Sequence, residues 1–497
     1  MSLVKRFASS VLWAQAGKVA ETALAFVLSI VVIRRLGPEL YGEYGLALGI
    51  LGVGTLLTSL GFRQILGKHV PQLTTKGDVP GVRFLLRWAF AWRVALSLAV
   101  LAAFLATAGL LARFFRLPDL RLYSAPLALL FIVQNAYLLL VALLNATLQM
   151  KRVVIINLVL WTADLAIVLT LFHLYGVSVV AVLYSSAIAT ALSLAVGLFL
   201  VRHWLRGEAT PAPTRPWWRF GATIWLTELA TFGLGNETDI LFMGYFLSDR
   251  AQIGFYRAAV MPVQRAMGFL FGAWSGLTMP VLAESHAARG EEGVRRAWNG
   301  YIKLVSLLAL PLLILLAALA EPILGLLYTD QFLQSARLLQ LYVLFKVVGF
   351  AIGHGLSTEM LQTLGREKLP FWMRLAGGGL NVLLNLLLIP RWGAAGALAA
   401  TGVAGLLVWF IETTVVVRHY RLQYPWAFLA KLLLASLGAA VIARLLPPGG
   451  WTGLMAGCAA FGLIFAVLFY LLRPLSEQDK AILVGVAPRM ARLVDLL

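Results

Sequence analysis

The chain has 497 residues, of which 61% are hydrophobic and only 13% charged, and its mean hydropathy is +0.86. These values exclude a soluble globular domain and indicate an all-α integral membrane protein. The net charge of +19 gives no reason to expect nucleic-acid binding, because Lys and Arg gather at the surfaces of membrane proteins where they meet lipid headgroups.

Apolar segments that could each cross roughly 30 Å of hydrocarbon as a helix recur along the whole chain. About fourteen transmembrane helices are predicted. The predicted spans cover residues 10–34, 40–62, 85–112, 123–148, 153–174, 177–201, 217–246, 251–283, 298–320, 332–361, 369–390, 393–417, 425–446 and 452–472.

The distribution of Lys and Arg between the loops predicts the orientation, because these residues accumulate in short cytoplasmic loops. With the N-terminus inside, and with Lys and Arg in the first or last three residues of a span counted with the adjoining loop, the cytoplasmic segments hold 24 of the 41 Lys and Arg residues, the external segments 8 and the spans 9. Both termini are therefore expected in the cytoplasm. The main contributors lie in two cytoplasmic loops: Arg63, Lys68, Lys76, Arg83, Arg87, Arg202, Arg206, Arg215 and Arg219.

An internal repeat divides the predicted helices into two groups. The motif G-x-Y-x-x-A begins at Gly42 and again at Gly254, each time just after an expected external turn. An aromatic-glycine step at Tyr175 recurs at Trp392, with a similar offset. Because six is even, two six-helix units in sequence both start on the cytoplasmic side, so a parallel repeat is predicted.

The proline-rich segment between the two units is the expected boundary. We predict an N-terminal six-helix lobe over residues 1–206, a cytoplasmic linker over 207–216 and a C-terminal six-helix lobe over 216–421. Residues 422–497 are expected to form two extra transmembrane helices and a cytoplasmic tail. Two similar lobes that face each other would enclose a central cavity.

Three stretches of the sequence carry a family resemblance. They are RRLGPELYGEYGLALGI at residues 34–50, DILFMGYFLSDRAQIGFYRAA at 239–259 and GREKLPFWMRLAGGGLNVLLNLLLIPRWGAAGALAAT at 365–401. Over nearly its whole length, the chain resembles the polysaccharide-transport flippases, which carry O-antigen and exopolysaccharide repeat units. These flippases belong to the multidrug/oligosaccharidyl-lipid/polysaccharide exporter superfamily.

This resemblance implies a function. A V-shaped pair of six-helix bundles would move an undecaprenyl-pyrophosphate-linked oligosaccharide by alternating access, through a cationic cavity, in a bacterial cytoplasmic (inner) membrane. The expected partners are the lipid-linked oligosaccharide and membrane lipids, and other polysaccharide assembly proteins are candidates. No cofactor is expected, although a proton gradient, a sodium gradient or the membrane potential is a candidate driving force.

The first span carries a polar face, and charge within a span should face a cavity or a partner helix. Polar or small residues recur there at helical spacing, at Gln15, Lys18, Thr22, Ala25 and Ser29. Glu21 lies beside this face. Two interpretations are about equally supported: the face lines the cavity, or Lys18 and Glu21 form a pair that only neutralises itself.

The stretch GNETDILFMGYF, residues 235–246, contains two carboxylates within an apolar run. On a straight helix, Glu228 and Asp239 lie on one face and are assigned to the cavity, whereas Glu237 faces a neighbouring helix. If Gly233 and Gly235 break the helix, this phase changes.

Further polar side chains share helix faces in other spans. The candidate headgroup ligands, including the first span's lysine, are Lys18, Arg257, Arg265, Lys346 and Arg374. The other candidate cavity or coupling residues are Gln15, Glu21, Thr22, Asp164, Glu228, Asp239, Gln264, Asn381 and Asn385. For the residues beyond the first span, packing and hydrogen bonding between helices is the alternative role. Arg257 is also expected at the depth of Asp239, where the two could form an ion pair.

Three other functions are alternatives that make different demands on the sequence. A cation-coupled drug or small-molecule antiporter of the same superfamily would favour an acidic, aromatic pocket without Lys18 and Arg265. A flippase for the peptidoglycan lipid precursor is a second alternative. A membrane-embedded glycosyltransferase or polymerase would need a larger external loop with catalytic acids, so no enzyme activity is expected.

Overall fold

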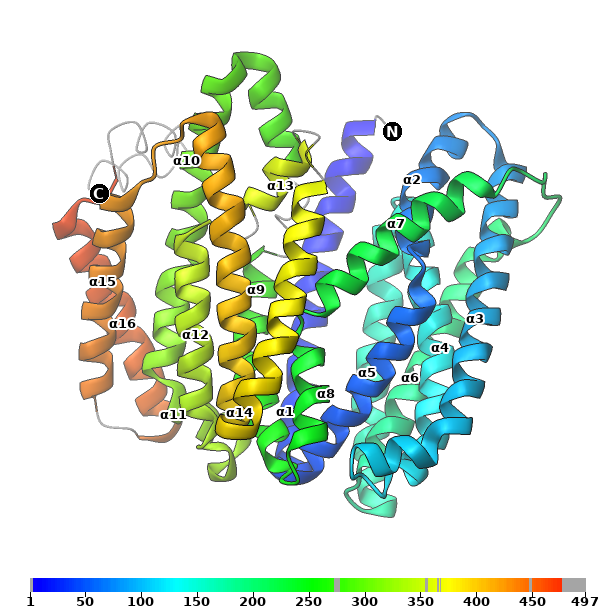
Figure 1. The fold of residues 1–497 in the computed structure, drawn as a ribbon, viewed down its shortest axis with the longest axis horizontal. Helices are drawn as coiled ribbons and strands as arrows, with labels where there is room; N and C mark the ends of the chain where they lie inside the picture. Colours follow the sequence, from blue (N-terminus) through cyan, green and yellow to red (C-terminus); the bar gives the residue numbers. More distant parts are fainter. Residues whose placement is uncertain are drawn as a thin grey trace. The chain divides into compact units, whose positions relative to one another are not determined.

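The computed structural model describes residues 3–271, 278–353, 356–363, 366, 368–446 and 449–475, and these residues form helices and no strand (Figure 1). The all-α prediction is therefore confirmed. The chain divides into two compact units, Met1–Gly254 and Phe255–Leu497.

The first unit contains eight helices and the start of a ninth. They are α1 (Leu3–Ser59), α2 (Phe62–Thr75), α3 (Val79–Phe114), α4 (Leu120–Ala146), α5 (Met150–Tyr175), α6 (Val179–Leu205), α7 (Arg215–Phe232), α8 (Asn236–Phe246) and the start of α9 (Ala251–Phe271). The second unit continues α9. Its other elements are α10 (Thr278–Ala318), α11 (Ala320–Tyr328), the short 3₁₀ helix η1 (Asp330–Phe332), α12 (Ser335–Ala351), α13 (Leu356–Thr363), α14 (Lys368–Tyr420), α15 (Trp426–Leu445) and α16 (Gly450–Leu472).

The two longest helices each combine two predicted spans. α1 is interrupted at Gly37, where φ is 69° and ψ is 176°, and α14 is interrupted at Gly393, where φ is 54° and ψ is −133°. Glycine tolerates positive φ because it lacks a Cβ atom, so the chain can turn sharply at these points. Each half is long enough to span a membrane.

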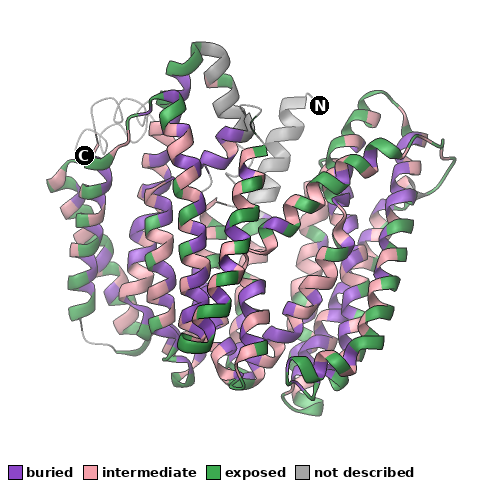
Figure 2. Ribbon diagram, viewed as in Figure 1, coloured by how far each residue is buried: buried purple, intermediate pink, exposed green. Residues whose placement is uncertain are grey.

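By length and composition, nine helices of the described chain could cross a membrane, or ten if the bent pair Gly17–Ser59 and Phe62–Thr75 is one span. Division of α1 and α14 at the two glycines, together with the broken pair α7–α8 and the helix α9, accounts for the remaining predicted spans. Among these helices, α3 has the smallest share of buried residues in its most apolar stretch, and many of its residues are exposed (Figure 2).

The segment after residue 62, predicted to be a cytoplasmic loop, is not an irregular loop but forms the amphipathic helix α2; its cytoplasmic location stays a prediction. Phe62, Ile65 and Leu66 are buried on one face, whereas Arg63 and Lys68 are exposed on the other. A search for long apolar spans misses such a helix, because its apolar face covers only part of its circumference.

The helix α7 packs against α2, since Trp217 joins Phe62, Leu66 and Trp88 in one buried cluster. Consequently residues 207–216, which were predicted to be the linker between lobes, lie within the first unit. The predicted lobe boundaries stay a prediction.

Candidate functional site

The first half of α1 carries the predicted pair of opposite charges. Lys18 Nζ lies 3.3 Å from Glu21 Oε1, and the two side chains are 48% and 20% exposed. Asn157 of α5 donates its amide N–H to Glu21 Oε2 over 3.1 Å, and Tyr137 of α4 donates its hydroxyl to Asn157 Oδ1. Three helices thus hold the carboxylate in place and leave the Lys18 ammonium group half exposed.

The rest of the predicted polar face divides into different environments. Thr22 is half buried, whereas Ala25 and Ser29 are buried in the first unit. Ser29 donates its hydroxyl to its own helix, at the carbonyl of Phe26 over 2.7 Å. The side chain of Gln15 lies outside the described residues. The face is therefore open at Lys18 and packed further along the helix.

A second polar cluster, centred on Arg93 of α3, was not singled out from the sequence. Arg93 is only 6% exposed. Its Nη1 donates to the carbonyl of Thr58 over 2.7 Å, and its Nη2 donates to Asn135 Oδ1, which also accepts the Thr58 hydroxyl over 2.9 Å. An Arg in the predicted span 85–112 was the available signal, because a charge at that depth needs partners.

Glu228 of α7 lies close to the Arg93 cluster. Its Oε2 accepts the Ser59 hydroxyl over 2.7 Å and its Oε1 accepts an N–H of Gln64 over 3.0 Å. The Glu228 carboxylate also attracts the Arg93 guanidinium electrostatically. This predicted cavity residue is therefore held by both sides of the α1–α2 junction.

Asp164 of α5 is buried and bonded to the neighbouring helix. One of its oxygens accepts the Ser185 hydroxyl over 2.7 Å, and the other accepts the Ser186 hydroxyl over 3.0 Å. Both hydroxyls belong to α6. This geometry is the one expected from interhelical hydrogen bonding, the alternative role considered for this residue.

The stretch with two carboxylates is not part of one straight helix. α7 ends at Phe232 and α8 begins at Asn236, because Gly235 is extended with φ −89° and ψ 159°. The helical phase that placed Glu228 and Asp239 on one face is therefore wrong. Asp239 is nevertheless 0% exposed and Glu237 is exposed, so the two carboxylates do lie in different environments.

The second unit holds the remaining predicted cations. Lys346 Nζ lies 5.2 Å from the ring centroid of Tyr342 and 5.4 Å from that of Trp409, which are cation–π distances. Arg257 and Arg265 are half buried. These cationic side chains lie within predicted spans without being fully enclosed.

Several other polar residues of the second unit lie on α14. Arg374 is half buried and attracts the buried carboxylate of Glu412, which accepts the Thr358 hydroxyl over 2.6 Å. Asn381 is buried and accepts the Thr401 hydroxyl over 3.1 Å. Asn385 is likewise buried, whereas Gln264 of α9 is exposed.

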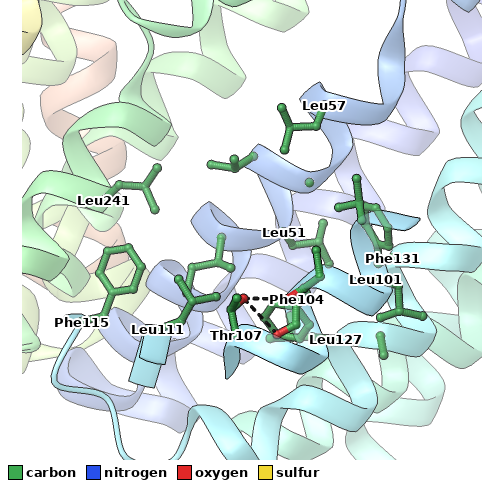
Figure 3. A pocket seen from close by; sticks show the side chains of 16 residues that line it. Leu51, Leu57, Leu101, Phe104, Thr107, Leu111, Phe115, Leu127, Phe131 and Leu241 are labelled. Carbon is green, nitrogen blue, oxygen red and sulfur yellow. Dashed lines mark hydrogen bonds between the residues drawn. The ribbon is translucent and has the colours of Figure 1, made fainter. Parts of the chain in front are cut away.

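An apolar cavity of about 290 Å³ lies within the first unit and was not predicted (Figure 3). α1, α3 and α4 line it with side chains such as Leu51, Phe104 and Phe131, and Leu241 comes from α8. Its one hydroxyl group, that of Thr107, donates to the Ala103 carbonyl over 2.7 Å. The cavity therefore offers space to apolar groups only.

Among the residues that the structure describes, no group of three or more His, Cys, Asp or Glu side chains could hold a metal ion. The site chemistry identified in this part of the chain thus consists of cations, hydrogen-bonding groups and apolar surface. Such groups can bind an amphipathic anion.

A family model described as polysaccharide biosynthesis protein matches residues 31–337, which is more than half of the chain. The chain belongs to the polysaccharide biosynthesis protein family. A model for the lipid II flippase MurJ matches residues 238–472. These matches confirm the predicted family resemblance.

Two solved structures show the same fold. A lipid II flippase MurJ in an inward closed conformation matches with a TM-score of 0.72 at 13% identity, covering 93% of this chain and 98% of that chain. An inward-facing multidrug resistance MATE family transporter of the MOP superfamily matches with a TM-score of 0.65 at 13% identity, covering 83% of this chain and 99% of that one. These two matches confirm the helical membrane fold that the family resemblance implies.

A curated relative is the multidrug resistance protein NorM of Burkholderia vietnamiensis, which is 27% identical over 215 residues. The match covers 41% of this chain and 45% of NorM. The chain thus spans less than half the length of this relative.

Proposed function

We propose that this protein is a flippase that moves an undecaprenyl-pyrophosphate-linked oligosaccharide repeat unit from the cytoplasmic to the periplasmic leaflet of the inner membrane. The observation that carries the proposal is the half-exposed ammonium of Lys18, held within a membrane helix by Glu21. A cation at this depth is costly unless it serves a binding or transport role, and a pyrophosphate can accept charge-assisted hydrogen bonds from it. Family membership supports a role in polysaccharide assembly.

In this proposal the cations contact the headgroup and the lipid tail stays in the bilayer. The candidate headgroup ligands are Lys18, Arg257, Arg265, Lys346 and Arg374. Alternating access exposes these groups to one side of the membrane at a time. A proton gradient, a sodium gradient or the membrane potential drives the cycle.

The test is to delete the gene and identify the lipid-linked glycan that accumulates on the cytoplasmic side. The proposal expects an undecaprenyl-pyrophosphate oligosaccharide, with export restored by the wild-type gene but not by Lys18→Ala. Accumulation of the peptidoglycan precursor would instead indicate that this lipid-linked precursor is the cargo. Unchanged glycans would overturn the proposal.

The similarity to NorM favours one competing function, a cation-coupled drug antiporter. That function expects the deletion strain to become sensitive to cationic drugs while its lipid-linked glycans stay normal. The same strain therefore separates the two proposals in two assays. Half-exposed Lys18 disfavours a cationic cargo, because like charges repel in a medium of low dielectric constant.

A further inference from the structure

A second hollow of the first unit, of about 480 Å³, lies at the turn between α3 and α4. Three arginines line it: Arg113 in the last turn of α3, Arg116 in the connection and Arg121 in the first turn of α4. The Arg121 guanidinium reaches back to α3, since a Cβ atom added to Gly109 would lie 3.3 Å from its Nη2. The three charges therefore converge on one small region.

These charges are not neutralised by ion pairs within the described part of the chain. All three side chains are exposed, and none forms an ion pair with a described carboxylate. The turn contains one acid, Asp119, so three positive charges and one negative charge leave a net charge of +2. An exposed site with this balance attracts anions.

The turn that carries the arginines is held by a buried side chain. Arg250, which follows α8, donates Nη2 to the carbonyls of Phe115 and Arg116 at the end of α3, and Nη1 to the carbonyl of Gly244 over 3.0 Å. Arg116 has a φ of 49°, and the Leu117 N–H closes the helix end on the Ala112 carbonyl over 2.8 Å. The arginines thus project from a defined backbone.

The exposed apolar face of α3 leads directly to this hollow. Leu98, Ala102 and Leu105 are exposed and, with Gly109 and Arg113, follow at steps of three or four residues, which places them on one side of the helix. Leu105 is 51% exposed, and contact with the hydrocarbon of a membrane would stabilise such an apolar face. The arginines therefore stand where this hydrocarbon contact ends.

The position of the arginines opposes the charge rule that predicts the topology. The α3–α4 turn is expected on the external side, where the loops hold 8 Lys and Arg residues against 24 in the cytoplasm. Three of those eight fall in this turn. Positive charges in an external loop oppose the predicted orientation, because Lys and Arg favour the cytoplasmic side. The need to orient the protein in the membrane therefore does not explain these three arginines.

We propose that the α3–α4 turn binds an anionic phospholipid of the outer leaflet. Arg113, Arg116 and Arg121 hold its phosphate, since a guanidinium fork matches phosphate oxygens, and one acyl chain lies along the exposed face of α3. The ligand is a lipid of the surrounding membrane and not the cargo. The inference rests on the predicted topology and is independent of the proposed transport.

The test measures lipid enrichment beside the site in the full-length protein reconstituted into phosphatidylcholine vesicles. In a Cys458→Ala background, Leu110→Cys places a fluorophore on the lipid-facing side of α3, where Leu110 is 67% exposed. Quenching by a trace of doxyl-labelled phosphatidylglycerol is compared with quenching by doxyl-labelled phosphatidylcholine. We expect phosphatidylglycerol to quench several-fold more effectively, with each arginine contributing on the order of fivefold at most.

The triple variant Arg113→Gln, Arg116→Gln, Arg121→Gln should make the two lipids quench equally. A matched variant that loses the same charge at the expected cytoplasmic side, Arg63→Gln, Lys76→Gln, Arg219→Gln, should keep the selectivity. If the triple Gln variant does not fold, the triple Lys variant, which keeps the charge without the fork, should retain part of the selectivity. Equal quenching in the wild type, or full selectivity in the triple Gln variant, would overturn the proposal.

Discussion

Gly42 and Gly254, the equivalent first residues of the repeated G-x-Y-x-x-A motif, each pack against the backbone that precedes the other. A Cβ atom added to Gly42 would lie 1.9 Å from the Arg250 carbonyl oxygen, and one added to Gly254 would lie 2.0 Å from the Pro38 carbonyl oxygen. Backbone atoms cannot rotate away as a side chain can. The repeat thus preserves a reciprocal close contact.

We predict that Gly42→Ala and Gly254→Ala will each destabilise the protein by about 1–3 kcal/mol or more, because overpacking forces the backbones apart. The measurement is thermal unfolding in detergent. Gly300→Ala in α10 is the matched control, since an added Cβ there meets no atom within 4 Å. Equal stability of all three variants would contradict the packing role.

Arg93 should be structural rather than a cargo ligand. Asn135→Ala removes a hydrogen bond to the buried Arg93 charge and should cost about 1.5–3 kcal/mol. Arg93→Met removes the charge itself and should cost less than Asn135→Ala, because no charge is then left buried with a partner missing. The comparison of unfolding midpoints checks this order, with exposed Lys76→Met as the control. The reverse order would refute the assignment.

Lys18 and Arg265 should be needed for transport and not for folding. Lys18→Ala or Arg265→Ala is expected to abolish glycan export at normal membrane abundance, because the pyrophosphate loses a charge-assisted contact. Lys18→Arg should keep partial export, and Lys76→Ala should keep all of it. Full export by the double Ala variant would exclude both residues as headgroup ligands.

The two carboxylates around α8 should respond differently. Asp239 is buried, so Asp239→Asn should impair export, whereas exposed Glu237→Gln should have little effect. If an ion pair with Arg257 is the whole role of Asp239, exchanging the two side chains should restore part of the export. If the carboxylate binds a coupling ion, the exchange will fail. An inactive Glu237→Gln beside a fully active Asp239→Asn would reverse the assignment.

The topology can be tested with labelled cysteines in a Cys458→Ala background. Cysteines at Lys76 and Glu291 should react only from the cytoplasm, and those at Ser248 and Gly449 only from outside. Lys76 and Glu291 are suitable positions, whereas the neighbouring Gly77 and Gly290 have positive φ angles of 72° and 57° that would strain a cysteine. Reaction of all four from one side would contradict the predicted orientation.

The sequence alone was sufficient for the fold class and for most of the long apolar helices. A helix needs about 20 apolar residues to cross the membrane, and a run of this length can be recognised in the sequence, for example at residues 123–148. The Lys18–Glu21 pair was visible for a similar reason, since residues three positions apart are neighbours on any helix.

Tertiary structure decided where helices break and which polar groups meet. The phase from Glu228 to Asp239 failed because Gly235 interrupts the helix, and a break resets the direction of every later side chain. The partners of Arg93 come from α1 and α4, and the arginine hollow joins the end of α3 to the start of α4. Periodicity describes one helix at a time, so contacts between helices depend on rotations and depths that only packing determines.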